Sequence, residues 1–193
     1  APNSIVGCGI EMAPEAEWSG VKAKYELPDE YVLYLGRVSK AKVDKLLPYF
    51  LRCKAKYGGD AKLVLVGGFE NEIRKFDSPD IVSDEEKTAI VRHATVMVNP
   101  SPMESLSLLM LEGMQSRIPL LVNGRSKVMK DHCRLSGAGL WYNNGRDFRK
   151  KLHRLLSDPE LRRTMSEKGP AYVREHYDWE IIIPKLRTLI ESI

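Results

Sequence analysis

Residues 95–122 read TVMVNPSPMESLSLLMLEGMQSRIPLLV and contain two short apolar runs, at 95–99 and 119–122, on either side of a stretch at 106–116 with helical spacing. Runs that are apolar throughout are typical of strands covered on both faces, as in a parallel sheet. Parallel neighbours need a crossover connection, which is usually a helix. The stretch therefore predicts a strand, a helix and a second strand of one parallel sheet.

Similar segments before and after this unit extend the pattern. The runs YVLYL at 31–35 and KLVLV at 62–66 predict two further strands, and weaker candidates lie at 80–82 and 140–142. Helical patterns lie between the strands, at 43–57, 70–75, 84–93 and 126–135. This alternation predicts an α/β fold, a Rossmann-like parallel sheet flanked by helices.

Two details refine the predicted helices. Ser83, with Glu86 three residues later, forms a capping box that predicts the start of the helix at 84–93. Pro48 lies inside the helix predicted at 43–57, where a proline removes a backbone hydrogen bond. This helix is therefore expected to start late or to bend.

The two ends of the chain differ from its middle. Beyond residue 142 the pattern is helical only, and Asp-Pro, Gly-Pro and Tyr-Asp breaks separate helices predicted at 145–156, 158–168, 169–176 and 179–193. We expect these helices to wrap the edge of the sheet. Residues 1–28 contain prolines and glycines without a periodic apolar pattern, and we interpret them as an interdomain segment that leads into one domain at 29–193.

Composition narrows the class of protein. The chain has 193 residues, 43% hydrophobic and 29% charged, which excludes disordered and fibrous proteins and indicates one globular domain. No apolar run is long enough to span a membrane and the first residues lack a signal-peptide pattern, so we expect a cytoplasmic protein. The net charge of +4 fits an anionic small ligand, peripheral contact with the inner face of a membrane, or neither, and is too small to indicate nucleic acid.

Cysteine and histidine positions do not suggest a metal site or a disulfide framework. The three cysteines show no CxxC spacing, and we expect them to be reduced and mostly buried: Cys8, Cys53 and Cys133. The histidines share no ligand spacing with Cys, Asp or Glu and are interpreted as structural: His93, His132, His153 and His176.

Ligands of open parallel sheets bind outside the carboxyl ends of the strands, so the loops after the strands are the candidate sites. The loop at 36–42 (GRVSKAK) combines a glycine with three cations beside a helix start and suits a phosphate, or else is a solvated basic turn. The loop Gly67-Gly68-Phe69 allows close backbone approach to a ligand, or is an ordinary turn. The absence of a GxGxxG pattern disfavours a dinucleotide.

The loop at 99–107 carries the most information. Ser105 or Ser107 can cap the following helix, whose free N–H groups would then form a second anion site. Glu104 would repel that anion unless it accepts hydrogen bonds from hydroxyl groups attached to it. Glu112, eight residues on, can face the same side of the helix. The alternative is that both glutamates are solvated surface residues.

The loop at 123–126 (NGRS) is the fourth candidate. Arg125 can reach the crevice from it, and the equally good alternative is a capped turn with Ser126 as the N-cap residue.

The order of these features resembles the C-terminal, donor-binding half of the retaining glycosyltransferases of family four, group 1, whose two facing Rossmann-like domains form the GT-B fold. The likeness covers residues 4–193. VGCGIEMAP is similar to the interdomain stretch of that family, YLGRVSKAK to its G-R-L-x3-K loop and KLVLVGG to its L-x-I-V-G-x-G strand. The segment from 81 to 122 is similar to the one that carries its E-x7-E motif, and 155–180 to its closing helices.

The resemblance implies roles for individual residues. Arg37 and Lys42 would neutralise the donor diphosphate, Glu104 would hold sugar hydroxyls near the anomeric carbon, and these three would serve catalysis. Glu112 would take the ribose hydroxyls. The backbone N–H groups around the turn and the glycine after the second strand would complete the donor site: Ser105, Leu106, Ser107, Leu108 and Gly67. Arg, Lys and helix N-termini would meet the phosphate charge, so no metal and no cofactor besides the nucleotide diphosphate sugar are implied.

The chain departs from the family pattern at three places. Glu104-Ser105-Leu106-Ser107 stands where the family more often has E-G-F-G, Val43 replaces the usual glycine after Lys42, and Cys8-Gly9 stand in the interdomain asparagine-glycine stretch.

The implied enzyme transfers a hexose to a glycan or lipid-linked acceptor, as in polysaccharide biosynthesis. The acceptor-binding N-terminal half is missing, so this chain is expected to bind donor without transferring sugar. The alternatives are a nucleotide-sugar epimerase or a phosphorylase on the same scaffold, or a non-catalytic α/β binding module.

Overall fold

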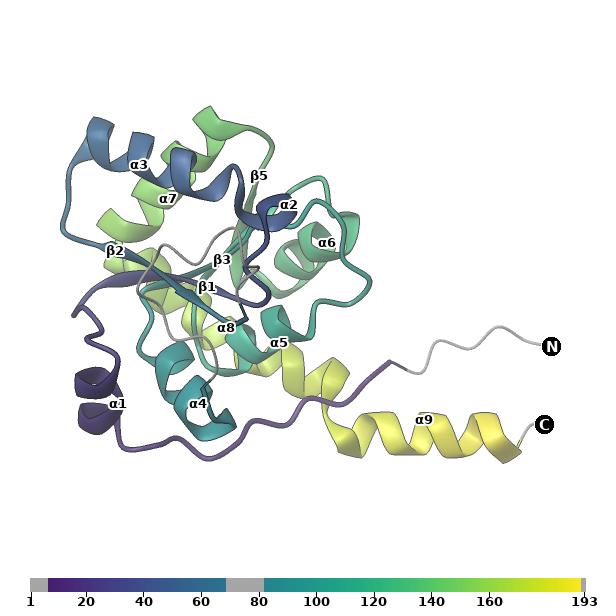
Figure 1. Ribbon diagram of the computed structural model, residues 1–193. Coiled ribbons are helices and arrows are strands. Elements are labelled where there is room, and N and C mark those ends of the chain that lie inside the picture. Colours follow the sequence, from purple (N-terminus) through teal and green to yellow (C-terminus); the bar gives the residue numbers. More distant parts are fainter. Residues whose placement is uncertain (1–6, 69–81, 192–193) are drawn as a thin grey trace.

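Five parallel strands form the central sheet, in the order β2-β1-β3-β4-β5 (Figure 1). The computed structural model describes residues 7–68 and 82–191. The strands lie within a residue or so of the predicted runs: β1 Tyr31–Leu35, β2 Lys62–Val66, β3 Val96–Asn99, β4 Leu120–Asn123 and β5 Gly139–Tyr142. The predicted parallel α/β fold is confirmed. Of the weaker candidate at 80–82 only Val82 is described, and it is not in a strand.

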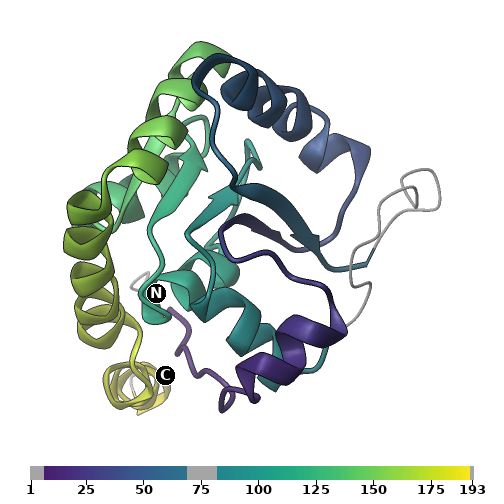
Figure 2. The same ribbon diagram turned by 90° about the vertical axis from the view of Figure 1, so that its left-hand side faces the viewer.

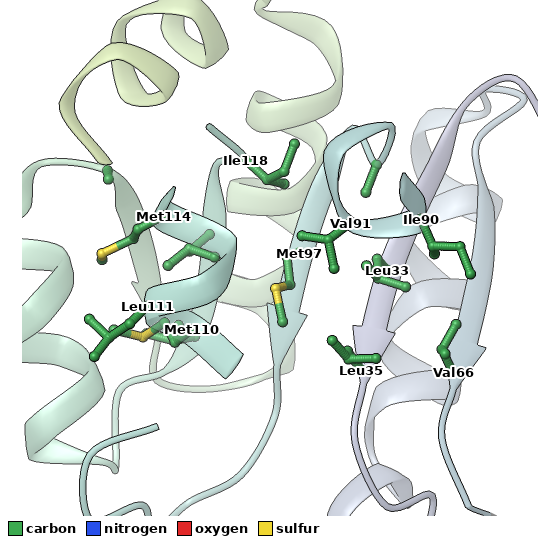
Figure 3. Packing of buried hydrophobic residues seen from close by; sticks show 14 of the residues in the cluster. Leu33, Leu35, Val66, Ile90, Val91, Met97, Met110, Leu111, Met114 and Ile118 are labelled. Carbon is green, nitrogen blue, oxygen red and sulfur yellow. The ribbon is translucent and has the colours of Figure 1, made fainter. Parts of the chain in front are cut away.

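Helices cover both faces of the sheet. The described helices are α1 Trp18–Lys24, α2 Lys40–Val43, α3 Leu46–Tyr57, α4 Asp84–Arg92, α5 Leu108–Gln115, α6 Lys127–Ser136, α7 Gly145–Ser157, α8 Pro159–Tyr177 and α9 Trp179–Glu191. Side chains of α3 and α7 form a core with one face of β1, including Val32 and Tyr34. Side chains of α4, α5 and α6 form a second core with the other face, including Leu33 and Leu35, part of which is drawn in Figure 3. All five residues of β1 are buried, which explains its unbroken apolar sequence.

The two predicted details of the helices are both explained by the structure. Ser83 and Glu86 form the capping box at the start of α4, so this prediction is confirmed. The helix predicted at 43–57 is divided into α2 and α3, and α3 starts late, at Leu46. Pro48 thus falls in the first turn of α3, where its missing N–H group has no partner to lose. The helix predicted at 70–75 lies outside the described residues.

The predicted break at Gly169-Pro170 is wrong, because α8 continues through it. Both residues are buried, and a Cβ atom added at Gly169 would lie 2.5 Å from the carbonyl oxygen of Met114. The glycine lets α8 approach the backbone at the end of α5, and this packing outweighs the hydrogen bond that proline removes. In Figure 2, α7 and α8 run along the left side of the molecule, and α8 contributes Met165 to one core and Val173 to the other. It therefore wraps the edge of the sheet, as predicted.

The segment before β1 contains a helix that the sequence pattern did not predict. The side chain of Glu17 caps α1, and Val21 is the residue of α1 that is buried in the core. Upstream, the N–H of Ile10 donates to the carbonyl of Tyr177 at 2.8 Å, and Gly9 lies against the ring of Trp179. The chain before α1 is thereby attached to the junction of α8 and α9.

Candidate functional site

The topology places one crevice outside the carboxyl ends of β1 and β3. The chain leaves β1 toward β2 on one side, whereas β3 leads to β4 and β5 on the other. The loop after β1 runs into helices on one face, and the loop after β3 runs into α5 on the opposite face. Such a reversal of strand order is where open parallel α/β sheets bind ligands.

The loops after β1 and β2 are joined through their backbones. The N–H of Gly36 donates to Val66 at 2.9 Å, and that of Val38 donates to Gly68 at 3.0 Å. Gly67 has a φ of +133°, and a Cβ atom there would lie 2.2 Å from the carbonyl oxygen of Gly36. The observed close approach at Gly67 is thus between two loops, and its contact with a ligand stays a prediction.

Arg37 and Lys42 both follow β1 and have exposed side chains. The hydroxyl of Tyr34 donates to the carbonyl of Arg37 at 2.7 Å and fixes the backbone there. Lys42 lies inside α2, which begins earlier than the predicted helix. Among the described carboxylates, none forms an ion pair with either side chain, so both cations can meet an anion.

The loop at 99–107 is held by hydrogen bonds that its own sequence provides. The side-chain oxygen of Asn99 accepts from the N–H of Ser101 at 3.0 Å, and its amide group donates to the hydroxyl of Ser107 at 3.1 Å. The amide of Asn123, after β4, donates to the carbonyl of Pro100 at 2.9 Å. These contacts fix the turn that precedes α5.

Ser107 is the N-cap residue of α5, but the predicted side-chain cap is wrong. Its hydroxyl makes no capping bond, and its backbone is left-handed, with φ +62° and ψ +66°. Few residues other than glycine adopt this conformation, which is consistent with the glycine that the family more often has here. The first N–H groups of α5 are therefore not occupied by a cap from Ser107 or, in the described structure, from Ser105.

Glu104 lies in the loop after β3 and interacts electrostatically with Tyr34 of β1. Its side chain is half-buried, and its negative charge adds to burial in raising the pKa of Tyr34 to about 12. Because Tyr34 also holds Arg37, the carboxylate of Glu104 and the backbone of Arg37 share one neighbour. The start of α5 also lies close to the loop after β1, because a Cβ atom added at Gly36 would be 3.3 Å from the Cδ1 atom of Leu109. The roles of Glu104 and Arg37 stay predictions.

Glu112 lies one turn into α5 and is only 16% exposed. Its Oε1 atom is 3.4 Å from the Nζ atom of Lys87 on α4. Its Oε2 atom is buried, and no described residue donates a hydrogen bond to it. A carboxylate oxygen in this state is costly, so the arrangement calls for a donor from outside the described residues.

Lys87 is a part of the site that the sequence reasoning missed. It lies 3.1 Å from Asp84 as well as 3.4 Å from Glu112. Burial acts to lower the pKa of Lys87, and the two carboxylates outweigh it, so the pKa lies above its ordinary value. Lys87 therefore remains charged and orients Glu112. The capping box fixes the register of α4, so the position of Lys87 on that helix could have been predicted from the sequence.

A cavity of about 530 Å³ opens at the carboxyl edge of the sheet. Of the predicted site residues, Lys42 lines it, whereas Arg37, Glu104, Glu112 and the turn at 105–108 are not among its described lining residues. The other lining residues come from α2, the start of α3 and the loops after β3, β4 and β5: Lys40, Asp44, Lys45, Tyr49, Pro100, Pro102, Asn123, Arg125, Tyr142, Asn143 and Asn144. The cavity therefore adjoins the crevice and extends from it along the sheet.

One histidine, His132, is hydrogen-bonded to the backbone of Leu106 in the loop before α5. His93 stacks on Trp18, His153 stacks on Tyr57, and buried His132 contacts the hydroxyl of Tyr172 at 2.9 Å. Cys53 and Cys133 are buried, and Cys8 is half-buried. Within residues 7–68 and 82–191, no three His, Cys, Asp or Glu side chains are grouped to hold a metal ion. No helix in these ranges has the length and apolar character needed to cross a membrane.

Comparison with known proteins shows which family the chain matches. The family described as "Glycosyl transferases group 1" matches residues 21–172. The alpha-D-kanosaminyltransferase of Streptomyces kanamyceticus is 27% identical over an alignment of 174 residues, and the match covers 80% of this chain and 44% of that protein. The chain spans less than half the length of three curated relatives that it matches.

Two solved structures have a fold similar to that of this chain. The sucrose-phosphate synthase of Thermosynechococcus elongatus matches 97% of this chain and 51% of its own, with a TM-score of 0.74 and 22% identity. HepE of Anabaena, solved in complex with UDP and glucose, matches 93% of this chain and 54% of its own, with a TM-score of 0.75 and 11% identity. At these identities the likeness concerns the fold, which is that of one half of a two-domain GT-B protein.

Proposed function

Since the chain belongs to the group 1 glycosyl transferases, we propose that it is the donor-binding half of a retaining, metal-independent glycosyltransferase. The whole enzyme would move a hexose from a nucleoside diphosphate sugar to a glycan or lipid-linked acceptor. The observation that carries the proposal is the buried, unpartnered Oε2 atom of Glu112. The two ribose hydroxyls of a nucleotide are donors of the kind that this oxygen lacks.

The remaining roles follow from position and charge. Arg37 and Lys42 would meet the diphosphate, together with the first N–H groups of α5 around Ser107. Glu104 would accept hydrogen bonds from the hydroxyls of the transferred sugar. Its negative charge also suits stabilisation of the positive charge that develops on the anomeric carbon when the bond to the diphosphate breaks.

Transfer of the sugar requires an acceptor-binding half in addition to this donor-binding half. The crevice is open on the side away from the sheet, and closure by an acceptor-binding half would exclude water from the reacting bond. The chain alone is therefore proposed to bind the donor without transferring sugar.

Direct titration of the chain with UDP, GDP and ADP tests the proposal. We expect one of them to bind with a micromolar to millimolar dissociation constant that is unchanged by EDTA, because the proposed phosphate contacts are side chains and backbone N–H groups. Loss of binding in EDTA would contradict the metal-independent site. Binding of none of the three would favour a non-catalytic module. If a nucleotide binds, sugar transfer by the whole enzyme distinguishes a transferase from an epimerase or a phosphorylase.

Lys42→Ala is expected to weaken nucleoside diphosphate binding about tenfold, or roughly 1–1.5 kcal/mol, the size of a hydrogen bond to a charged group at an exposed position. Binding of the nucleoside without phosphates should change little. Calorimetric titration of both ligands measures the difference. Lys150→Ala, which removes an exposed lysine of α7, is the matched control. Equal losses for nucleoside and diphosphate would place Lys42 away from the phosphates.

A further inference from the structure

The cavity beside the crevice has a lining of unbalanced positive charge. Lys40, Lys42, Lys45 and Arg125 all line it, whereas Asp44 is the one carboxylate among its described lining residues. No carboxylate in residues 7–68 and 82–191 forms an ion pair with any of these four cations. With Asp44 counted, the described walls carry an excess of about three positive charges over a space that is about 530 Å³ in volume.

The donor diphosphate does not account for all of this charge. In the proposed function the diphosphate lies at Arg37 and Lys42, and Arg37 is not among the described residues that line the cavity. Lys45 directly precedes α3, and Arg125 lies in the loop between β4 and α6. Lys45 and Arg125 line the same cavity as Lys42 but are not assigned to the diphosphate, so their charge is additional to that of the two cations proposed to hold it.

Their positions are electrostatically unfavourable without an anion. A positive charge just before a helix opposes the positive end of the helix dipole, and Lys45 and Arg125 both lie within two residues of a helix start. The first turns of α3 and α6 contain no acidic residue, in contrast to α4, which begins with Asp84. An anion bound near these cations would offset their unfavourable interaction with the helix dipoles.

The loop that carries Arg125 is fixed at its backbone while its side chain is exposed. The N–H of Arg125 donates to the side-chain oxygen of Asn123 at 3.1 Å, and the amide of Asn123 donates to Pro100 at 2.9 Å. Ser126 then caps α6. The guanidinium group is therefore available, from a defined backbone position, for two parallel hydrogen bonds to a carboxylate or phosphate.

We propose that this cavity binds a sugar that carries a carboxylate or a phosphate group, with Arg125 and Lys45 holding the negative charge. The inference rests on the proposed function, because it assumes that the donor diphosphate binds at Lys42 and extends no further into the cavity. The anionic group has two conceivable sources, the transferred sugar of the donor or the acceptor sugar. The volume of the cavity suits a monosaccharide unit, since sites for small ligands measure roughly 300–1,000 Å³.

The first arm of the test concerns the donor. The 193-residue chain is titrated with UDP, UDP-glucose and UDP-glucuronate, which differ in the sugar and its charge. If the charged group belongs to the donor, UDP-glucuronate should bind about fivefold or more tighter than UDP-glucose, as expected for one charge-assisted contact. The second arm uses free glucose 6-phosphate against free glucose, with and without saturating UDP, and reports an acceptor source.

Variants identify the residues that hold the charge. Arg125→Gln combined with Lys45→Gln should abolish the preference for the anionic sugar and leave binding of bare UDP unchanged. Lys127→Gln combined with Lys150→Gln removes the same charge from exposed positions outside the cavity lining and should keep the preference.

Each outcome decides between the two proposals. Nucleotide binding without a preference for either anionic sugar would overturn this inference and leave the proposed function standing. A preference that persists in the Arg125 and Lys45 double variant would also overturn it. Absence of nucleotide binding, with glucose 6-phosphate still bound in a manner that depends on Arg125, would contradict the proposed function and support the cavity assignment.

Discussion

Replacing Gly67 by alanine is expected to lower the free energy of unfolding by about 3–5 kcal/mol, because two costs add. The first is conformational, since the φ of +133° at this position is rarely adopted by any residue with a side chain. The second is steric, because the new Cβ atom would lie 2.2 Å from the carbonyl oxygen of Gly36. That carbonyl belongs to a backbone held by the bond from Gly36 to Val66, so it cannot move cheaply.

Urea unfolding monitored by circular dichroism measures this effect. Gly68→Ala is the matched control, because no atom of residues 7–68 and 82–191 lies within 4 Å of a Cβ added there and its φ is not positive. The control should change stability by less than about 1 kcal/mol. If the two variants were equally stable, the close contact between the loops after β1 and β2 would be wrong.

Glu112→Gln is expected to weaken nucleoside diphosphate binding by about 1.5–3 kcal/mol, or roughly 10- to 100-fold, because a ribose hydroxyl loses its charged acceptor. The free energy of unfolding should change by less than about 1 kcal/mol, since the lost attraction to Lys87 is offset by the removal of a buried charge. Titration calorimetry and urea unfolding on the same samples measure both quantities. A structural role for Glu112 predicts the opposite pattern, with lower stability and unchanged affinity.

Two further variants serve as controls for Glu112. Glu104→Gln makes the same chemical change at a residue assigned to the transferred sugar, so it should leave the affinity for the bare diphosphate nearly unchanged. Glu85→Gln removes an exposed charge of α4 and controls for the electrostatics of the whole surface. If all three variants bound the nucleotide equally well, the assignment of Glu112 to the ribose would be untenable.

The positions of the strands were predictable from sequence because the signal is local. The central strand β1 is buried along its whole length, so the apolar run itself marks it. The capping box at Ser83 is equally local. The candidate residues Arg37, Lys42, Glu104 and Glu112 could be selected because they follow strands at the edge where ligands bind.

The features that could not be predicted depend on tertiary contacts. The continuity of α8 through Gly169-Pro170 depends on its packing against Met114, which no local pattern announces. The left-handed backbone of Ser107 is imposed by the loop before α5, against the preference of serine. The cavity draws its cations from α2, the start of α3 and the loop after β4, and only the fold brings Lys45 and Arg125 to one space.

The most direct test of the donor site joins Glu112 to the ribose hydroxyls in a thermodynamic cycle. The chain and its Glu112→Gln variant are each titrated with the nucleoside diphosphate that binds best and with its dideoxy counterpart, which lacks both ribose hydroxyls. If the buried oxygen of Glu112 accepts from the ribose, the variant should lose affinity for the normal nucleotide only, with a coupling energy of about 1.5–3 kcal/mol. Equal losses for the two nucleotides, and hence no coupling, would contradict a ribose at Glu112.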